Sequence, residues 1–253
     1  MSLKKKKLKI IVVMPAYNAE KTLERTVKDL PKNFIDEIIL VDDASRDNTV
    51  EIAKRLGLSV YVHKKNKGYG GNQKTCYKKA LKKGADIVIM VHPDYQYDSS
   101  LCKELVEPII NGRFDIMFGS RIRTRKEALE GGMPWYKYFI NRLLTVIENF
   151  ILGVNFSEHL SGFRAYNKEV LKTIPFVSFS DDFVFDQQFM ISAIAFGFRV
   201  GEIPIPVRYF SESSSIKFLK GGKFLIGTFF TLFLYILFKT KIYKSKIFDY
   251  RRK

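Results

Sequence analysis

Runs of β-branched and other apolar residues recur along the first half of the chain, and each ends at a polar or glycine-containing segment. The runs that predict strands cover residues 8–14, 37–41, 59–63 and 86–91. The segments between them have the length and apolar spacing of helices, at residues 20–30, 47–56 and 73–83. Strands that alternate with helices in this way predict βαβ units and a mostly parallel sheet flanked by helices. We therefore expect an α/β fold.

The second half of the chain is less regular. Its pattern predicts strands at residues 115–119 and 199–209 and a helix at residues 184–196. Residues 135–152 predict an amphipathic helix. Its apolar stripe contains Tyr136, Phe139, Ile140, Leu143, Ile147, Phe150 and Ile151, and its opposite side contains Lys137, Asn141, Thr145 and Glu148. Such a stripe packs either on the core of the protein or in a membrane interface.

An apolar run of 15 residues, 224–238, lies between Lys223 and Lys239 near the end of the chain. A helix that crosses a bilayer perpendicular to its plane needs about 20 apolar residues. The run therefore predicts an amphipathic, membrane-associating helix that lies in the interface or docks on the body of the protein. We expect an α/β domain at residues 1–215, followed by this helix and a basic tail at residues 216–253.

The net charge of +17 is concentrated at the two ends of the chain. Residues 1–9 carry five lysines and no acid, and residues 217–253 carry ten lysines and arginines and one acid. The 207 residues between them have a net charge of only +3. A nucleic-acid groove needs basic residues throughout the fold, whereas basic clusters beside an apolar helix suit anionic lipid headgroups. We expect a membrane surface rather than nucleic acid as partner; solvated charged tails are the alternative interpretation.

Acidic residues follow one of the predicted strands. Asp42 and Asp43 come at the end of the strand at residues 37–41. In open α/β sheets the carboxyl ends of the strands border the crevice in which ligands bind. Carboxylates at this place accept hydrogen bonds from the N–H groups of a nucleobase or from ribose hydroxyls. Capping of the next helix is the alternative interpretation of the pair.

Three side chains that bind metals follow the strand at residues 86–91. They are His92, Asp94 and Gln96, at spacing i, i+2 and i+4. Carboxylate and amide oxygens suit Mg²⁺ or Mn²⁺, and imidazole is better tolerated by Mn²⁺. The two strand ends therefore predict a site for a nucleotide and a divalent cation. A turn that Pro93 enforces at the strand end is the alternative interpretation.

Other polar residues allow two interpretations each. The glycine-rich segment that contains Lys67 and Gly68 is either a phosphate-binding loop or a flexible turn, and it lacks the Lys-Ser/Thr ending of a P-loop. Arg121 and Arg164 bind phosphate by forked hydrogen bonds or form salt bridges. The acids at residues 181–182 provide a general base or place negative charge at a helix N-terminus.

Together these segments resemble the family 2 glycosyltransferases, which have a Rossmann-like GT-A fold. The resemblance rests on residues 12–18 (Val-Val-Met-Pro-Ala-Tyr-Asn), on residues 41–49 (Val-Asp-Asp-Ala-Ser-Arg-Asp-Asn-Thr) and on residues 92–94 (His-Pro-Asp). Within the family the chain is most similar to the dolichol-phosphate mannose synthase branch, which transfers sugars to polyprenyl phosphates. Residues 119–121 (Gly-Ser-Arg) and above all 161–166 (Ser-Gly-Phe-Arg-Ala-Tyr) carry this likeness.

The resemblance implies roles for particular residues. The nucleotide pocket is expected to contain Pro15, Ala16, Tyr17, Glu20, Asp42, Asp43, Lys67 and Gly68, with Asp43 on the base. The metal, Mg²⁺ or Mn²⁺, is expected on Asp94 and Gln96, and the phosphates on Arg121 and Arg164. The family usually has an acid where this chain has His92. This histidine is expected either to ligate the metal or to hydrogen-bond the donor.

The implied activity is the inverting transfer of a sugar from a nucleotide sugar to a polyprenyl phosphate at the cytoplasmic face of the membrane. An ionised phosphate attacks the anomeric carbon without a general base, so the protein has to position it and stabilise the leaving diphosphate. In a second interpretation the acceptor is the hydroxyl of a glycan or glycolipid, and Asp182 is the general base that it needs. In a third, the chain is a non-catalytic nucleotide-binding relative.

Overall fold

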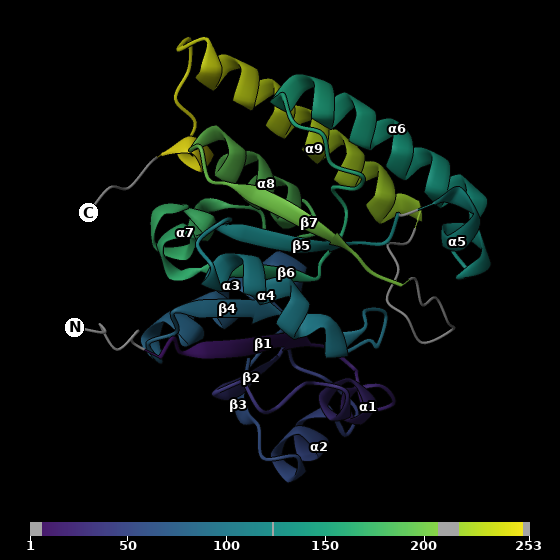
Figure 1. Cartoon of the computed structure of the whole chain (residues 1–253), viewed down its shortest axis with the longest axis vertical. Coiled ribbons are helices and arrows are strands. Elements are labelled where there is room, and N and C mark those ends of the chain that lie inside the picture. Colours follow the sequence, from purple (N-terminus) through teal and green to yellow (C-terminus); the bar gives the residue numbers. More distant parts are fainter. Residues whose placement is uncertain (1–6, 123, 207–217, 250–253) are drawn as a thin grey trace.

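A seven-stranded sheet forms the centre of the computed structural model, which describes residues 7–122, 124–206 and 218–249 (Figure 1). Its strands are β1 (Ile10–Ala16), β2 (Glu37–Asp42), β3 (Ser59–Val62), β4 (Ile87–Met90), β5 (Ile116–Ser120), β6 (Arg164–Asn167) and β7 (Val200–Pro204). They lie in the order β3-β2-β1-β4-β6-β5-β7. All neighbouring pairs are parallel except those of β6, which runs antiparallel to β4 and to β5. The predicted α/β fold with a mostly parallel sheet is confirmed.

Helices cover both faces of the sheet. The α-helices are α1 (Leu23–Lys28), α2 (Thr49–Arg55), α3 (Gly68–Lys82), α4 (Cys102–Ile110), α5 (Arg125–Glu130), α6 (Trp135–Leu152), α7 (Lys168–Thr173), α8 (Phe185–Ala195) and α9 (Phe218–Lys239). Three short 3-10 helices are η1 (Ser99–Leu101), η2 (Phe176–Ser178) and η3 (Lys246–Phe248). Helices α1, α2 and α4 pack on one face, and α3, α7 and α8 pack on the other.

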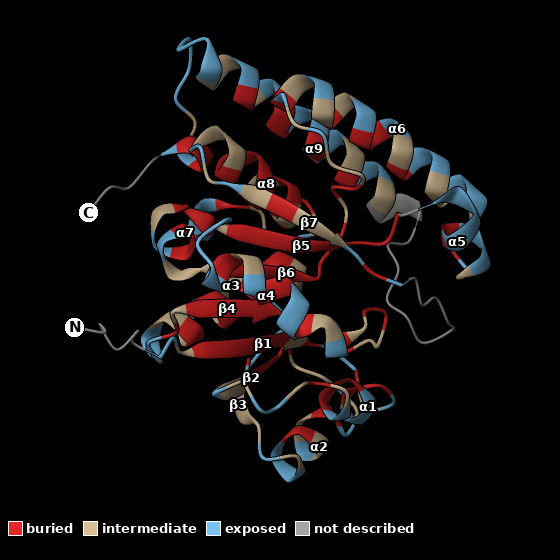
Figure 2. Cartoon of the chain, in the orientation of Figure 1, coloured by how far each residue is buried: buried red, intermediate tan, exposed pale blue. Residues whose placement is uncertain are grey.

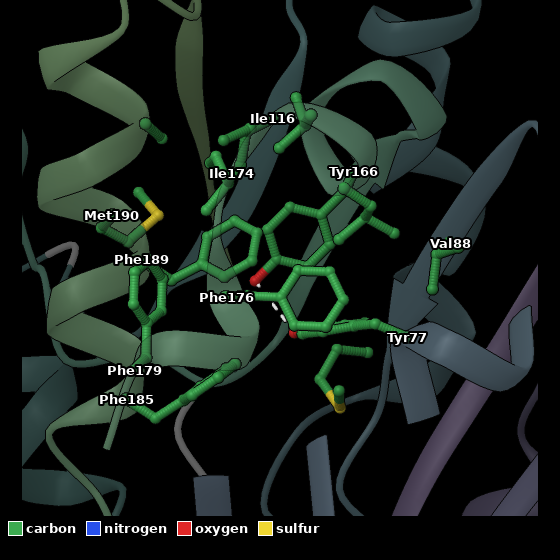
Figure 3. Packing of buried hydrophobic residues seen from close by; sticks show 14 of the residues in the cluster. Tyr77, Val88, Ile116, Tyr166, Ile174, Phe176, Phe179, Phe185, Phe189 and Met190 are labelled. Atoms are coloured by element: carbon green, nitrogen blue, oxygen red, sulfur yellow. Dashed lines mark hydrogen bonds between the residues drawn. The ribbon is translucent and has the colours of Figure 1, made fainter. Parts of the chain in front are cut away.

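Alternating strand residues supply the two cores. On β1, Ile11 and Val13 point into the core beneath α3 and α8, whereas Val12 and Met14 point into the core beneath α1 and α4. All four are fully buried, and Figure 2 shows the inner strands buried along their length. Aromatic rings fill much of the first core, where the hydroxyls of Tyr77 and Tyr166 are hydrogen-bonded at 3.3 Å (Figure 3). This burial on both faces explains why the central strands β1 and β4 are apolar at every position.

The order of the strands places a ligand crevice beside β1. From β1 the chain proceeds to β2 and β3 on one side, and it returns to β4 on the other side. The carboxyl ends of β1 and β4 therefore diverge at the point where the strand order reverses. Ligands bind at such a point in doubly wound sheets. The segments that follow β1, β2 and β4 contain most of the residues that we predicted to bind the nucleotide and the metal.

The amphipathic helix α6 faces the opposite way to an ordinary surface helix. Its polar residues Asn141, Thr145 and Glu148 are buried, whereas Leu143 is 65% and Phe150 88% exposed. Core packing therefore accounts for only part of the stripe: Ile147 and Ile151 pack against the core, whereas Leu143 and Phe150 do not. Because exposed apolar patches of this kind mark interaction sites, α6 presents a surface for an apolar partner.

Helix α9 lies beside α6 along the outside of the molecule (Figure 1). One side of α9 packs on α8 and buries Leu232 and Tyr235, while Phe230 and Phe233 on the other side are more than half exposed. Within the described residues, one segment, residues 221–239, is long and apolar enough to cross a bilayer by length and composition alone. Its contacts with α8 match the docked helix that we predicted.

Some elements differ from the sequence prediction. Residues 164–167 form strand β6, which we did not predict. Helix α3 begins at Gly68, five residues before the helix predicted at 73–83. Strand β7 ends at Pro204, and the rest of the strand predicted to residue 209 lies partly outside the described residues. The expected domain boundary at residues 215 and 216 also lies outside them.

Candidate functional site

Asp43 fastens the glycine-rich loop to the end of β2. One of its carboxylate oxygens accepts from the Nδ1 of His63 at 2.7 Å and from the backbone N–H of Lys67 at 2.9 Å. The other accepts from the backbone N–H of Gly68 at 3.0 Å. Asp43 is 3% exposed, so these bonds compensate for the burial of its charge. The structure thus gives Asp43 a positioning role toward Lys67 and Gly68, while contact of Asp43 with a base stays a prediction.

Asp42 has one carboxylate oxygen that is left to accept a further hydrogen bond. Its Oδ2 accepts from the backbone N–H of Ser45 at 3.0 Å, and its Oδ1 is buried without a hydrogen-bond partner among the described residues. The Oδ1 of Asn72 is also buried without a partner, while its amide donates to the carbonyl of Val41 at 3.0 Å. Buried acceptors without donors are rare and call for an explanation. A bound N–H or O–H group would supply the missing donors.

The loop after β1 is tied to the loop after β2. Glu20 accepts from the backbone N–H of Asn48 at 3.1 Å and from its side-chain amide at 3.0 Å. Ala16 is fully buried at the end of β1, and Tyr17 follows it with 51% of its surface exposed. The exposed Tyr17 ring is available to a flat ligand, whereas Glu20 holds the two loops together. Pro15, in β1, is half-buried.

A strained turn presents Asp94 and Gln96 to one cavity. Tyr95, which lies between them, has a φ of 59°, a left-handed conformation that bulky residues rarely adopt. Its hydroxyl donates to Asp29 at 2.8 Å, and the guanidinium of Arg25 lies 4.3 Å from its ring centre. Contacts with α1 therefore hold the turn. Strain of this kind concentrates at functional sites.

His92 follows β4 and is embedded against Tyr69 of α3. The two rings are stacked with centres 5.3 Å apart, and the Nε2 of His92 lies 3.2 Å from the Tyr69 hydroxyl. Burial lowers the pKa of His92. A side chain at Gly162 would place its Cβ 2.8 Å from this Nε2, so only glycine fits beside the pair. The His92 Nε2 is thus enclosed by protein atoms.

A cavity of about 450 Å³ brings these groups together with residues from the second half of the chain. Its polar lining comprises Tyr69, His92, Asp94, Gln96, Tyr97, Arg121, Lys137, Asn141, Asp186 and Gln187. Its apolar lining comprises Met133, Tyr136, Ile140, Leu144, Leu160, Phe183, Phe224 and Leu225. The apolar part is formed largely by α6 and α9, the two helices with exposed apolar faces. A ligand with a polar head and an apolar tail matches both parts.

Asp94 and Gln96 are suited to hold a divalent cation in this cavity. They contribute a carboxylate and a carboxamide to its lining, and oxygen donors of these two kinds are ligands of Mg²⁺ and Mn²⁺. The described residues contain no cluster of three histidine, cysteine or acidic side chains with metal-binding geometry. A cation here would therefore depend on oxygens of a bound diphosphate and on water for most of its ligands.

Two basic residues line the cavity at its α6 side. The guanidinium of Arg121 is paired with Glu158, which is fully buried and also accepts from Asn141 at 2.9 Å. Lys137 forms no ion pair with any residue that the structure describes. Burial, together with the charge of Arg121, lowers the pKa of Lys137. A bound anion would relieve the repulsion between the two cations.

Arg164 lies beneath this cavity rather than in its lining. Its guanidinium, 1% exposed, donates to the carbonyls of Ser161 at 2.7 Å, Asp186 at 3.0 Å and His159 at 3.2 Å. It is also 3.6 Å from a carboxylate oxygen of Asp186. These bonds occupy the guanidinium within the protein. The structure therefore gives Arg164 the role of bracing three segments, and its expected contact with phosphate finds no support in the geometry.

Asp186 is the acidic residue that faces the cavity from α8. Its carboxylate accepts from the Tyr69 hydroxyl at 2.6 Å and from the Gln73 amide at 3.0 Å, in addition to its pairing with Arg164. These two hydrogen bonds and the ion pair tie Asp186 to α3 and to β6. Asp186 thus positions its neighbours. The expected base, Asp182, is exposed and lies outside the cavity lining; its carboxylate accepts from the N–H of Phe183 at 2.8 Å.

Sequence reasoning missed several residues of the cavity. Lys137 and Asn141 were assigned to the polar side of a helix, and their spacing of four residues was a signal that both reach one site. Asp186 and Gln187 open the helix predicted at 184–196, but only the fold places them opposite His92. Tyr69 lies in the glycine-rich segment, and its position in the sequence does not indicate that its side chain reaches the cavity. The structure supplies the side of each helix that faces the cavity, which spacing alone does not give.

Comparison with known families and curated proteins places the chain among the sugar-transferring enzymes. Residues 11–174 match the model of Glycosyl transferase family 2. The chain is similar to UDP-N-acetylglucosamine–dolichyl-phosphate N-acetylglucosaminyltransferase of Methanococcus voltae, with 31% identity over 235 residues that cover 86% of this chain and 91% of the relative. It is similar also to dolichyl-phosphate hexose transferase of Haloferax volcanii, with 25% identity over 84% of this chain and 89% of the relative. These relatives confirm the expected polyprenyl-phosphate branch.

Solved structures share the fold. Glucosyl-3-phosphoglycerate synthase of Mycobacterium tuberculosis, in complex with Mn²⁺, UDP-glucose and phosphoglyceric acid, superimposes with a TM-score of 0.70. The match covers 94% of this chain and 81% of the synthase, at 20% identity. The likeness confirms the expected GT-A architecture.

Proposed function

Because the chain belongs to glycosyl transferase family 2, we propose that it transfers a sugar from a nucleotide sugar to a polyprenyl phosphate at the cytoplasmic face of a membrane. The observation that carries the proposal is the cavity of about 450 Å³ with a polar and an apolar part. The polar part contains the Asp94–Gln96 pair and the cations Arg121 and Lys137. The apolar part adjoins helices whose outer faces are apolar.

The donor is proposed to bind with its nucleoside at the ends of β1 and β2 and its diphosphate toward Asp94. The unpartnered Oδ1 of Asp42 supports the first part of this placement, and the residues Asp94 and Gln96 support the second. Mg²⁺ or Mn²⁺ on these two residues would neutralise the charge of the leaving diphosphate. The complex of the synthase of Mycobacterium tuberculosis with Mn²⁺ and UDP-glucose, on the same fold, is consistent with this choice of ion.

The phosphate of the acceptor is proposed to bind between Arg121 and Lys137. Both cations line the cavity, and the lowered pKa of Lys137 reflects a burial that no carboxylate of a described residue compensates. Asn141, one turn after Lys137, adds an amide that is already oriented by Glu158. The Arg121–Glu158 pair fixes the guanidinium in place, so the anion meets a preorganised site.

The lipid chain of the acceptor is proposed to leave the cavity along α6 and α9. Tyr136 and Ile140 line the cavity and are themselves about half exposed, so they connect its interior with the outer apolar face. That face continues through Leu143 and Phe150 on α6 and Phe230 on α9. Buried in a bilayer interface, these side chains would gain the free energy of leaving water. The lysines and arginines of residues 217–253 favour an anionic leaflet.

The proposed reaction is a single displacement with inversion. A phosphate monoester is largely ionised near neutral pH, so its oxygen attacks the anomeric carbon as the bond to the leaving diphosphate breaks. No proton has to be removed from the acceptor. Among the described cavity residues the carboxylates belong to Asp94 and Asp186. The first is proposed for the metal, and the second already accepts two hydrogen bonds and pairs with Arg164, which agrees with a reaction that needs no general base.

An assay with membranes tests the function. The protein is incubated with membranes, Mn²⁺ or Mg²⁺, and a panel of labelled nucleotide sugars. The proposal expects label in an organic extract, released by mild acid because a glycosyl phosphate is acid-labile. K137M is expected to abolish most of this label, whereas K126M, which changes an exposed lysine on α5, is expected to retain it. Label in glycans, with none in the lipid extract from any donor, would contradict the proposal.

A further inference from the structure

Gln187 carries a carboxamide that has no hydrogen-bond partner. The residue lies in the first turn of α8 and is fully buried. Neither its Nε2 nor its Oε1 has a partner within the part of the chain that the structure describes. Gln187 nonetheless lines the cavity described above. A buried amide with both groups unpaired is rare in folded proteins, because each unpaired group loses its hydrogen bonds to water.

The side chains on either side of Gln187 have hydrogen-bond or ion-pair partners within the protein. Asp186 accepts from Tyr69 and Gln73 and pairs with Arg164. Gln188 accepts from the backbone N–H of Ser180 at 2.7 Å. These bonds hold the start of α8 in place. Of the three side chains, Gln187 is the one whose buried polar atoms have no partner among the described residues. This contrast indicates that the partner of Gln187 comes from outside the protein.

The proposed reaction determines which group lies near Gln187. The transferred sugar has to lie between the diphosphate that it leaves and the phosphate that it joins. Asp94 and Gln96 are assigned to the first of these, and Arg121 and Lys137 to the second. Gln187 lines the same cavity as both pairs and carries no charge. Its neutral amide is therefore left for the sugar itself.

We infer that the Gln187 carboxamide binds hydroxyl or amide groups of the transferred sugar and so contributes to the choice of donor. The inference rests on the proposed function. A carboxamide offers one acceptor and two donors, and a sugar hydroxyl both donates and accepts. A phosphate offers only acceptors near neutral pH, and a lipid chain offers neither. The chemistry of the side chain thus matches the sugar better than the phosphates or the lipid chain, and the nucleoside is already assigned to the ends of β1 and β2.

Glu148 is the competing partner inside the protein. Both of its carboxyl oxygens are buried without a partner among the described residues, and its side chain interacts with the charge of Arg164, as the carbonyl of Asp186 does. If a small shift joined Gln187 to Glu148, the amide would be a structural group. Replacement of Gln187 by methionine separates the two cases. Loss of an unpaired amide stabilises the free protein or leaves its stability unchanged, whereas loss of an internal hydrogen bond destabilises it.

The experiment compares Q187M with Q188M, a matched change at the neighbouring glutamine. Thermal unfolding is measured without ligand. Binding is measured calorimetrically, with Mn²⁺, for UDP and GDP and for UDP-N-acetylglucosamine, UDP-glucose and GDP-mannose. We expect Q187M to have an unchanged or higher Tm, to bind the free diphosphate within about twofold of wild type, and to bind the matching nucleotide sugar about tenfold more weakly. Q188M is expected to keep the wild-type ratio of the two affinities.

Three results would overturn the inference. Equal affinities of Q187M and wild type for the nucleotide sugar would exclude a contact with the sugar. Equal weakening for the diphosphate and the nucleotide sugar would place the amide at the diphosphate. A Tm several degrees lower in Q187M would make it a structural group. If wild type transfers sugar to lipid and Q187M discriminates between donors as wild type does, only the inference about Gln187 fails. If wild type binds no nucleotide sugar, the proposed function fails as well.

Discussion

The hydroxyl of Tyr69 lies 2.6 Å from the Oδ2 of Asp186. The hydroxyl has one hydrogen, and the carboxylate of Asp186 is an acceptor, so Tyr69 donates to it. The same hydroxyl lies 3.2 Å from the Nε2 of His92, which must then carry a hydrogen and donate it to Tyr69. Of the two ring nitrogens of His92, only Nδ1 remains to bind a metal or to accept a hydrogen bond from the nucleotide sugar. Tyr69 of α3 thereby joins His92, which follows β4, and Asp186 of α8 in one hydrogen-bonded chain.

Removal of this hydroxyl in Y69F is expected to lower kcat by about tenfold, because the rings and carboxylates around the cavity lose their fixed orientation. Y77F is the matched control. Tyr77 is fully buried and also donates through its hydroxyl, to Gln73 at 2.9 Å, but it does not contact His92. Both variants should lose about 1 kcal/mol of stability. Only Y69F should lose activity.

Nitrogen NMR of the histidine side chains tests the proton assignment directly, since the chain contains only three histidines. The wild-type spectrum should show the His92 hydrogen on Nε2, and Y69F should weaken that preference. A wild-type His92 with its hydrogen on Nδ1 alone would contradict the assignment.

Substitution of Lys137 should separate the two substrates. K137M removes one of the cations proposed for the acceptor phosphate and is expected to raise the KM for polyprenyl phosphate at least about tenfold. The affinity for the nucleoside diphosphate should change by less than about twofold, because Lys137 is not assigned to the donor. Steady-state kinetics with each substrate varied in turn measures both. Equal losses for donor and acceptor would show that Lys137 does not act on the acceptor.

Glu148 should make stability depend on pH. Burial raises the pKa of Glu148 to about 8, from an ordinary value of 4.5. Between these two values the unfolded chain releases the proton that the folded chain keeps, so stability falls as the pH rises from 4.5 to 8 and changes little above that. E148Q carries no such proton. Its free energy of unfolding, relative to wild type, is expected to rise across this range by as much as about 4 kcal/mol.

Chemical denaturation of E148Q and wild type at pH 5 and pH 8.5 measures this difference. A constant difference between the two proteins at both pH values would mean that Glu148 ionises normally in the folded protein.

The apolar face of α6 should be needed for membrane binding. Val146 on this face is 57% exposed, and Val177 on η2, outside it, is 55% exposed. V146E places a charge where the proposal puts the lipid interface and is expected to weaken binding to anionic vesicles about tenfold. V177E is expected to bind as wild type does. Vesicle sedimentation measures both, and equal binding by the two variants would exclude α6 as the membrane contact.

The sequence predicts the parts of the fold that local patterns determine. The apolar strands β1 and β4 and the apolar centre of β2 are buried on both faces, and their length and composition identify them. Strand β6 was missed because Arg164, Ala165, Tyr166 and Asn167 do not form an apolar run. Its position comes from pairing with β4 and β5, which are distant in sequence. Tertiary pairing of this kind leaves little local signal.

The sequence predicts more of the site residues from the first half of the chain than from the second. The acids after β2 and β4 lie where the sheet topology predicts a ligand crevice, and Asp94 lines the cavity, while nucleotide and metal binding by these residues stay predictions. Arg164 was expected on a phosphate, yet the fold buries it and uses its donors on backbone carbonyls. Periodicity separates the two sides of α6, but it does not show that Asn141 faces inward and Leu143 outward. That orientation depends on the partner of each side.

The central claim is that the acceptor is a phosphate on a polyprenyl chain. The most direct measurement offers the purified protein one labelled nucleotide sugar, Mn²⁺, and either a polyprenyl phosphate or the polyprenol of the same length. We predict labelled lipid from the phosphate and none from the alcohol, because the cavity supplies cations for an ionised acceptor, while the carboxylates of its described residues are assigned to the metal and to hydrogen bonds within the protein. Transfer to the polyprenol at a comparable rate, or to a soluble glycan with neither lipid labelled, would contradict it.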